Sequence, residues 1–203
     1  MDKSQRADFG HSWDAFRQGS KQAYEFLYKD HFQSLYEYGA RLCEDKALVK
    51  DAIQDLFIKL WHSRARLGKV NSVRFYLLVS LRNIIFNKLR QSKRAAPALP
   101  YSFELVFSYE QVLIETERNA RLAANLTEAL NRLTFRQKEA IYLRFYEERS
   151  YAETAALMDI SVKAVYKIIA RALDALKRQF GEEGIKVFLI LIHSQPGSCK
   201  FLR

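Results

Sequence analysis

The chain has 203 residues, of which 49% are hydrophobic and 28% charged, a composition that excludes a disordered protein and allows one large or two small globular domains. Only three prolines and seven glycines are present, which favours helices over a turn-rich β architecture. The formal net charge of +10 is the sign expected of a protein that meets phosphates, although proteins of ribosomes and membrane surfaces share it.

Cysteine usage and apolar runs narrow the class further. The two cysteines, Cys43 and Cys199, are too few for a disulfide framework or a zinc site. The start, MDKSQRADFG, has no apolar core of a signal peptide. The apolar run near the end, IKVFLILI, is far shorter than the roughly 20 residues that cross a bilayer. We therefore expect a cytoplasmic protein.

Two amphipathic helices are predicted first. From Lys21 to Leu42, apolar residues recur at steps of three and four, which is typical of a helix with one buried face. After Asp45, a plausible N-cap, a second helix carries an apolar stripe that ends near Trp61. The other face of this second helix carries the polar residues Asp51, Gln54 and Asp55.

A basic segment follows. The loop HSRARLGKVNS leads into a third predicted helix, VRFYLLVSLRNIIFNKLRQSKR, capped by Asn71 or Ser72. No Asp or Glu occurs between Asp55 and Glu104. Cations in such a segment can follow a phosphate backbone, and aromatic rings can stack on unpaired bases. The cations are Arg64, Arg66, Lys69, Arg74, Arg82, Lys88, Arg90, Lys93 and Arg94.

The aromatic residues of this segment have two interpretations. They can be core residues beneath a solvated basic face, or they can form part of a surface for nucleic acid. We expect core positions for Phe75 and Phe86, and a functional position for Tyr76.

A second helical module is predicted after a linker. The segment AAPALP contains two of the three prolines and ends the basic helix. A helical block then begins near Arg118, and the next helix is capped by Thr134. Two further helices, Ser150 to Met158 and Val162 to Phe180, are separated only by the residues DIS.

These last two helices have the pattern of a helix-turn-helix. Ala155 is the small residue required where the helices cross, Asp159 occupies the turn position that needs a positive φ, and Ser161 caps the second helix. The residues expected to pin the helices together are Met158, Ile160, Val165 and Ile168. The alternative is an ordinary αα-hairpin with a solvated basic face. The tight turn, the small residue and the cations together favour the helix-turn-helix.

The order of these elements resembles the extracytoplasmic-function subgroup of bacterial RNA polymerase sigma factors, the minimal branch of the sigma-70 family. FLYKDHFQSLYEYGARLCED and ALVKDAIQDLFIKLW resemble the first helices of the second sigma region, and the basic helix resembles its promoter-melting helix. LNRLTFRQKEAIYLRFYEERSYAETAALMDISVKAVYKIIARALDALKR resembles the fourth region.

The resemblance implies an all-α fold of two small helical domains joined by a flexible linker. Residues 1–20 would be an N-terminal tail, 21–94 region 2, 95–118 the linker, 119–180 region 4, and 181–203 an extension of unknown role. The third region and the long N-terminal autoinhibitory region of larger relatives have no room in this chain.

The resemblance also implies roles for residues. A flipped base of the non-template strand would be held by the loop 64–72. Core-polymerase binding falls to Asp51, Gln54 and Asp55. Contacts with the −10 region of the promoter fall to Arg64, Arg66, Lys69, Tyr76, Asn83, Lys88, Arg90, Lys93 and Arg94. Contacts with the −35 region fall to Ser161, Lys163, Ala164, Tyr166, Lys167 and Arg171.

The implied partners are core RNA polymerase, promoter DNA and a membrane-associated anti-sigma factor, and the resemblance implies no cofactor, metal, small-molecule substrate or catalytic residue. One rival is a helix-turn-helix regulator that binds duplex DNA without polymerase. Another is a helical nuclease or phosphoryl-transfer enzyme, but the sequence contains no P-loop and no clustered acidic metal site.

Overall fold

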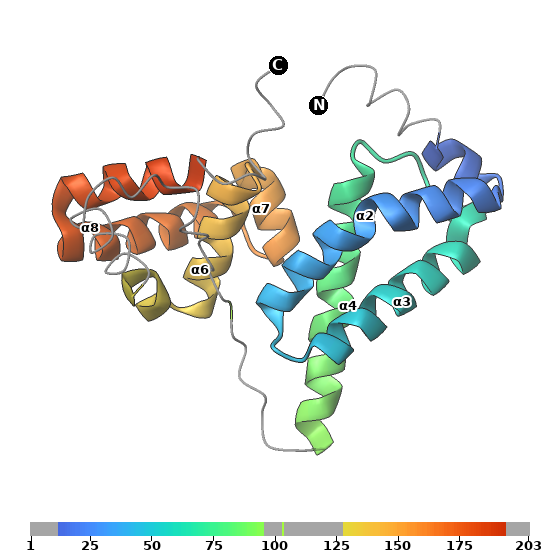
Figure 1. Cartoon of the computed structure of the whole chain (residues 1–203), viewed down its shortest axis with the longest axis horizontal. Coiled ribbons are helices and arrows are strands. Elements are labelled where there is room, and N and C mark those ends of the chain that lie inside the picture. The colour runs from blue at the N-terminus through green and yellow to red at the C-terminus, as the bar shows by residue number, and fades with distance from the viewer. Residues whose placement is uncertain (1–11, 96–102, 104–127, 194–203) are drawn as a thin grey trace. The chain divides into compact units, whose positions relative to one another are not determined.

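The computed structural model describes residues 12–95, 103 and 128–193, and the side chains of 12–91, 103 and 128–178. The chain divides into two compact units, Met1–Ser102 and Phe103–Arg203. Within the described residues the ordered elements are helical and no strand occurs (Figure 1). The predicted all-α class is confirmed.

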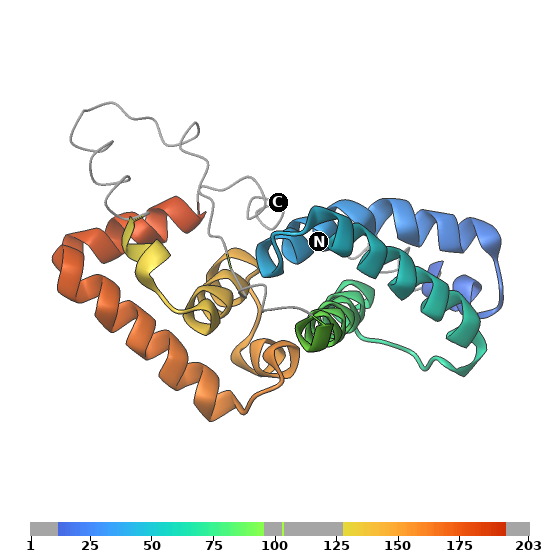
Figure 2. The same ribbon diagram turned by 90° about the horizontal axis from the view of Figure 1, so that it is seen from below.

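The first unit is a bundle of three long helices. These are α2 (Lys21–Leu42), α3 (Lys46–Ser63) and α4 (Val73–Ala95), with a short 3-10 turn, η1 (Arg64–Arg66), after α3. Each long helix packs against the other two, with α2 and α3 side by side and α4 crossing them (Figures 1 and 2). The core contains Leu27, Leu35, Tyr38, Ile53, Phe57, Leu77, Leu81 and Ile85.

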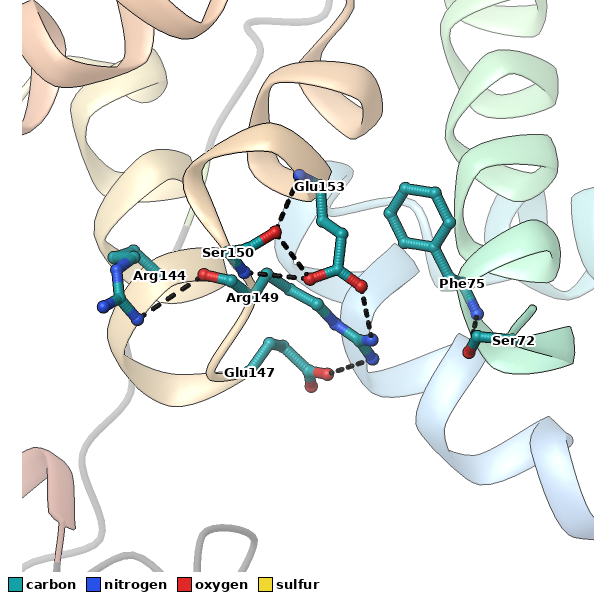
Figure 3. Close-up of polar contacts among 7 residues, drawn as sticks. All are labelled: Ser72, Phe75, Arg144, Glu147, Arg149, Ser150 and Glu153. Atoms are coloured by element: carbon teal, nitrogen blue, oxygen red, sulfur yellow. Dashed lines mark hydrogen bonds and ion pairs between the residues drawn. The ribbon is translucent and has the colours of Figure 1, made fainter. Parts of the chain in front are cut away.

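Side-chain caps begin these helices where the sequence places them. The Asp45 carboxylate accepts hydrogen bonds from the Ala47 and Leu48 amides at 2.9 and 3.0 Å, which confirms it as an N-cap. Of the two residues considered for α4, Ser72 is the cap, since its hydroxyl accepts from the Phe75 amide at 3.2 Å (Figure 3).

Gly39 allows the three helices to approach closely. A Cβ atom at this position would lie 2.7 Å from Val49 Cγ1 and 3.3 Å from Ile85 Cδ1. The first distance is shorter than real Cβ contacts, so any larger residue would force the Val49 side chain or the helices to shift.

The segment expected to be an N-terminal tail contains a helix. Residues 12–17 are helical, and Trp13 and Phe16 are only 2% and 0% exposed. The expectation of a tail over 1–20 is therefore wrong for its second half. Fewer than two helical turns are too short for a helical period to be recognised in the sequence, although the two rings three residues apart lie on one face. Residues 1–11 lie outside the described part.

The second unit is built on one long helix. After a helical stretch at 128–132 come α6 (Phe135–Ile141), a π-helical turn η3 (Tyr142–Tyr146), α7 (Tyr151–Met158) and α8 (Val162–His193). Both α6 and α7 pack on α8. The core contains Leu130, Ala140, Leu143, Ala155, Leu157, Val165, Ile169, Ala172 and Leu176.

Phe103 is a buried residue within the predicted linker. It is 1% exposed, and its ring lies 6.0 Å from that of Phe135 and 5.5 Å from that of Tyr142. Residue 103 is thus part of the second unit's core. The rest of the predicted linker, apart from residue 95 at the end of α4, lies outside the described residues, and its boundaries remain a prediction.

Helix α8 is longer than predicted. It continues to His193 instead of ending near Phe180, and its last part bends back sharply (Figures 1 and 2). Gly181 and Gly184 fall in this stretch, and sharp bends are typical of glycine. Each glycine costs about 1 kcal/mol in a helix relative to alanine. This low helix propensity is consistent with a predicted helix that ends at Phe180.

Hydropathy sets one further limit on the described helices. None of them combines the length and the apolar character required to cross a membrane.

Replacing Gly39 with alanine tests the close approach. We expect Gly39→Ala to lower the free energy of unfolding of the first unit by about 1–2 kcal/mol, because the overlap with Val49 outweighs the better helix propensity of alanine. Urea denaturation followed by tryptophan fluorescence measures this, since Trp13 and Trp61 are the chain's two tryptophans and both belong to this unit. Gly68→Ala is the control, because nothing lies within 4 Å of its Cβ position. Equal stability of the two variants would contradict the expectation.

Candidate nucleic-acid interface

The turn between α7 and α8 has the predicted geometry. Asp159 adopts a left-handed conformation with φ 54° and ψ 51°, and the Ile160 amide donates to the Ala155 carbonyl at 3.0 Å. The Ser161 hydroxyl accepts from the Ala164 amide at 3.2 Å, so it caps α8 as predicted. This arrangement confirms the tight turn of a helix-turn-helix.

A network of charged residues fixes the start of α7. Ser150 and Glu153 form a reciprocal capping box, in which the Glu153 carboxylate accepts from the Ser150 amide at 2.9 Å. The Arg149 guanidinium lies 3.5 Å from the Glu147 carboxylate and 3.9 Å from that of Glu153 (Figure 3). The Arg149 carbonyl in turn accepts from Arg144 at 3.5 Å. These contacts hold α7 at a defined angle to the preceding turn.

The first turns of α8 present a basic face. Tyr166 is 53% exposed, and its ring stacks on Tyr151 with centroids 3.9 Å apart. The guanidinium of Arg144, in η3, lies 5.2 Å from the centroid of the Tyr151 ring, in α7. No acidic residue occurs between Asp159 and Asp174 in the sequence. Of the predicted contacts, Ala164 is half-buried, and the exposed ones are Ser161, Lys163, Tyr166, Lys167 and Arg171.

Val162 is an exposed residue of this face that the sequence analysis did not select. Its side chain is 41% exposed in the first turn of α8. Apolar side chains at such positions can contact the methyl group of thymine in a major groove. The signal was available in the sequence, because an apolar residue beside the cap lies outside the packing pattern.

The basic loop between α3 and α4 contains cations in two different states. Arg66 and Lys69 are exposed, as expected of residues that meet phosphates. Arg64 is half-buried, because its guanidinium donates to the Trp61 carbonyl at 2.7 Å and lies 4.3 Å from the Trp61 ring centroid. Arg64 therefore helps to fix the end of α3, a role that the sequence analysis did not anticipate.

Two side chains of residues 12–17 hold the same loop. Trp13 Nε1 donates to the Gly68 carbonyl at 3.1 Å, and Arg17 Nε donates to the Leu67 carbonyl at 2.6 Å. The Trp13 ring also lies edge-on to Tyr76, with centroids 5.7 Å apart. The sequence analysis missed both donors, because it treated this segment as a tail.

Further aromatic rings pack next to Trp13 and Trp61. The Phe16 ring lies 5.5 Å from that of Trp13 and 6.2 Å from that of Trp61, and Tyr24 lies 5.2 Å from Trp61. Burial raises the pKa of the Tyr24 phenol, with a smaller contribution from Tyr28. The Trp61 ring, which the Arg64 guanidinium covers, thus belongs to an aromatic cluster with Phe16 and Tyr24.

The cations of α4 are less free than the acid-free sequence implied. Lys88 Nζ lies 2.7 Å from the Asp55 carboxylate of α3, so a residue predicted to bind DNA pairs with one predicted to bind polymerase. Both side chains are partly exposed, and a pair of this kind is worth about 0–1 kcal/mol. Asn83 and Arg90 are exposed. Lys93 and Arg94 belong to α4, but their side chains lie outside the described part.

The two aromatic residues of α4 that were predicted to be in the core are only partly buried. Phe75 and Phe86 are both half-buried, and the Arg82 guanidinium lies 4.4 Å from the Phe86 ring. Tyr76, predicted to be functional, is also half-buried. Its ring packs edge-on against Trp13, and part of its surface remains exposed.

A third surface lies on α3. Asp51 and Gln54 are exposed and Asp55 is half-exposed, as predicted. Ile58 is 53% exposed, and its spacing of seven, four and three residues from them places it on the same face. An exposed apolar residue beside acidic ones suits a contact with a basic protein partner. Ile58 was not selected from the sequence.

The described residues contain no group of three or more His, Cys, Asp or Glu side chains that could hold a metal ion.

Two family models match the chain. "Sigma-70 region 2" matches residues 27–95, and "Sigma-70, region 4" matches residues 123–176. Together they cover more than half of the chain, in the order in which their region numbers run, and each falls in a different unit of the structure.

Curated relatives match across both units. RNA polymerase sigma factor NccH of Alcaligenes xylosoxydans xylosoxydans is 28% identical over 162 residues, which cover 76% of this chain and 85% of NccH. RNA polymerase sigma factor CarQ of Myxococcus xanthus is 25% identical over 86% of this chain and 98% of CarQ. ECF RNA polymerase sigma factor SigX of Bacillus subtilis (strain 168) is 23% identical over 78% of this chain and 84% of SigX.

Solved structures share the fold. CnrH, in complex with the cytosolic domain of CnrY, is 23% identical with a TM-score of 0.53, over 82% of this chain and 93% of CnrH. The sigma factor RpoE, in complex with the anti-sigma factor NepR from Bartonella quintana, is 19% identical with a TM-score of 0.55, over 80% of this chain and 96% of RpoE.

Proposed function

This chain belongs to the sigma-70 family of RNA polymerase sigma factors, in its extracytoplasmic-function subfamily, and we propose that it binds core RNA polymerase, recognises a promoter and helps to separate its strands. The observation that carries the proposal is the presence of regions 2 and 4 in one chain. A helix-turn-helix regulator needs only the second of them. The match to region 2 therefore favours the sigma factor over that rival.

Promoter recognition falls to the second unit. The capped N-terminal end of α8 enters a major groove of the −35 region, as the second helix of a helix-turn-helix does. Lys163, Lys167 and Arg171 lie on its exposed face and contact phosphates or base edges. The stack of Tyr166 on Tyr151 fixes one ring of this face before DNA arrives.

Strand separation falls to the first unit. Extracting a base from the duplex costs a few kcal/mol, and stacking on aromatic side chains returns about 1–3 kcal/mol per base. The loop 64–72 receives the base, with Tyr76 and Asn83 beside it. Exposed cations such as Arg66, Lys69 and Arg90 hold the phosphates of the unpaired strand.

Docking on core polymerase falls to α3. Its acidic edge and Ile58 form a surface for a basic, partly apolar partner. The phosphodiester bond is then made by core polymerase, and this chain performs no catalytic step of its own. Its place of action is the cytoplasm, where the polymerase is.

An anti-sigma factor completes the set of partners. CnrH and RpoE were solved with the cytosolic domain of CnrY and with NepR, respectively. We propose that this chain also binds an anti-sigma factor, and that this factor is associated with the membrane.

Transcription in vitro tests the function. Core polymerase with this protein, supplied with a library of promoters, is expected to start transcripts at a defined subset that core alone ignores. Sequencing of transcript starts measures this. Sequence-specific binding of the isolated protein to duplex DNA, with no transcripts that depend on it, would support the regulator instead.

Charge reversal on α3 tests docking. We expect Asp51→Lys with Asp55→Lys to weaken binding to core polymerase at least about tenfold, because two attractive contacts become repulsive. Titration of labelled core measures the affinity, and circular dichroism checks that the helices persist. Glu25→Lys with Glu44→Lys is the matched control, since both glutamates are exposed in the same unit. Equal affinity of the two double variants would count against this docking surface.

Loss of two lysines on α8 tests recognition. We expect Lys163→Ala with Lys167→Ala to weaken holoenzyme binding to −35 duplex DNA and to reduce the slope of log K against log salt by about 2, one for each phosphate contact. Lys21→Ala with Lys29→Ala, exposed on α2, removes the same charge elsewhere. A salt slope that the α8 variant leaves unchanged would mean that these lysines do not contact DNA.

A further inference from the structure

The loop 64–72 is fixed from outside as well as from within. Its own backbone hydrogen bonds lie toward its ends, from the Leu67 amide to Arg64 at 3.3 Å and from the Tyr76 amide to Ser72 at 3.1 Å. In the middle of the loop, the consecutive carbonyls of Leu67 and Gly68 accept from Arg17 and Trp13 instead. Both donors come from a helix 50 to 55 residues earlier in the chain.

These donors are themselves held in place. Trp13 is 2% exposed, so its position is set by the packing of its ring against Phe16 and Tyr76. The Arg17 side chain is 27% exposed, and its guanidinium also donates to the Asp14 carboxylate at 3.0 Å. A charged donor on a neutral carbonyl is a stronger tether than a neutral pair. The helix therefore presents two fixed donors to a loop that contains an exposed glycine.

The segment 12–19, formed by this helix and the turn after it, lies near both ends of the loop. The Trp13 ring contacts Tyr76, the proposed neighbour of the base on α4. At the other end of the loop, a Cβ atom on Gly19 would lie 3.7 Å from Arg64 Nε. Fixing one backbone residue costs about 1–2 kcal/mol of conformational entropy. A tethered loop loses that entropy when the protein folds, so base binding does not have to offset it.

We propose that Trp13 and Arg17 are positioning residues for base capture. Their hydrogen bonds to the main chain of Gly68 and Leu67 fix the backbone conformation in which the loop 64–72 selects its base. This inference depends on the proposed function and adds to it the part of the chain that gives the loop its specificity. The ligand is an unpaired base of promoter DNA, and the two residues act on it through the loop.

The test uses full-length protein in holoenzyme with Arg17→Ala and, separately, Trp13→Phe. The phenylalanine keeps an aromatic ring and loses the indole N–H. The measured quantity is the affinity for single-stranded −10 oligonucleotides that carry each of the four bases at each position. At the captured position, we expect the preference of the wild type for one base to fall about tenfold in each variant, as loss of one such tether would produce.

Three controls separate positioning from general damage. Arg132→Ala removes an exposed, ion-paired arginine from the other unit and is expected to change nothing. Affinity for core polymerase and for −35 duplex DNA is expected to match the wild type. Arg17→Lys keeps the charge and a single donor nitrogen, and is expected to recover part of the base preference.

Each result decides the inference. Preferences like those of the wild type in both variants would overturn it, and so would a weakening that is equal for all four bases. Should Arg17→Ala fail to bind core polymerase, Trp13→Phe decides alone. A wild-type holoenzyme that opens no promoter would instead overturn the proposed function, so the two failures are distinguishable.

Discussion

The close approach of three helices at Gly39 is the constraint on which the first unit depends. Val49 of α3 and Ile85 of α4 occupy the space where a side chain of residue 39 would be. Both helices therefore contact α2 at Gly39. The acidic face of α3 and the basic face of α4 are therefore surfaces of one rigid bundle. The two faces belong to different helices of the same unit, and the proposed function assigns one partner to each of them.

In the second unit, different contacts position the helices that form the surface. Its short α7 buries one face against α8, and polar contacts add to its positioning. These are the capping box of Ser150 and Glu153, the guanidinium of Arg149, and the left-handed Asp159. These contacts are local in sequence, which is why a single sequence could predict the turn. The basic face of α8 is then presented by a turn whose one left-handed residue, Asp159, is held in place by these neighbouring contacts.

Long helices and caps could be predicted because their determinants are local. The apolar period predicts α2 with its observed bounds, and Asp45, Thr134 and Ser161 cap helices where the pattern begins, as predicted. Ser150, predicted as the first residue of a helix, is the N-cap of α7. The surface contacts of the candidate site could be placed but not tested, and they remain predictions.

The remaining features depend on contacts between distant residues. The tethers from Trp13 and Arg17 join segments 50 or more residues apart, and the pair of Lys88 with Asp55 joins two helices. An acid-free stretch of sequence says nothing about the acid that a neighbouring helix supplies. The length of α8 was missed for the opposite reason, since its two glycines lower local propensity while the helix continues.

The ion pair between Lys88 and Asp55 has a thermodynamic consequence for the proposed partners. If core polymerase engages Asp55, Lys88 loses its counter-charge and attracts a phosphate more strongly; if DNA engages Lys88, Asp55 becomes more available to the polymerase. Linkage requires the two effects to be equal in free energy. For a partly exposed pair that coupling is at most about 1 kcal/mol, a factor of about five in affinity. The isolated protein would therefore hold DNA slightly less well than the assembled enzyme does, through one reciprocal contact that favours the ternary complex.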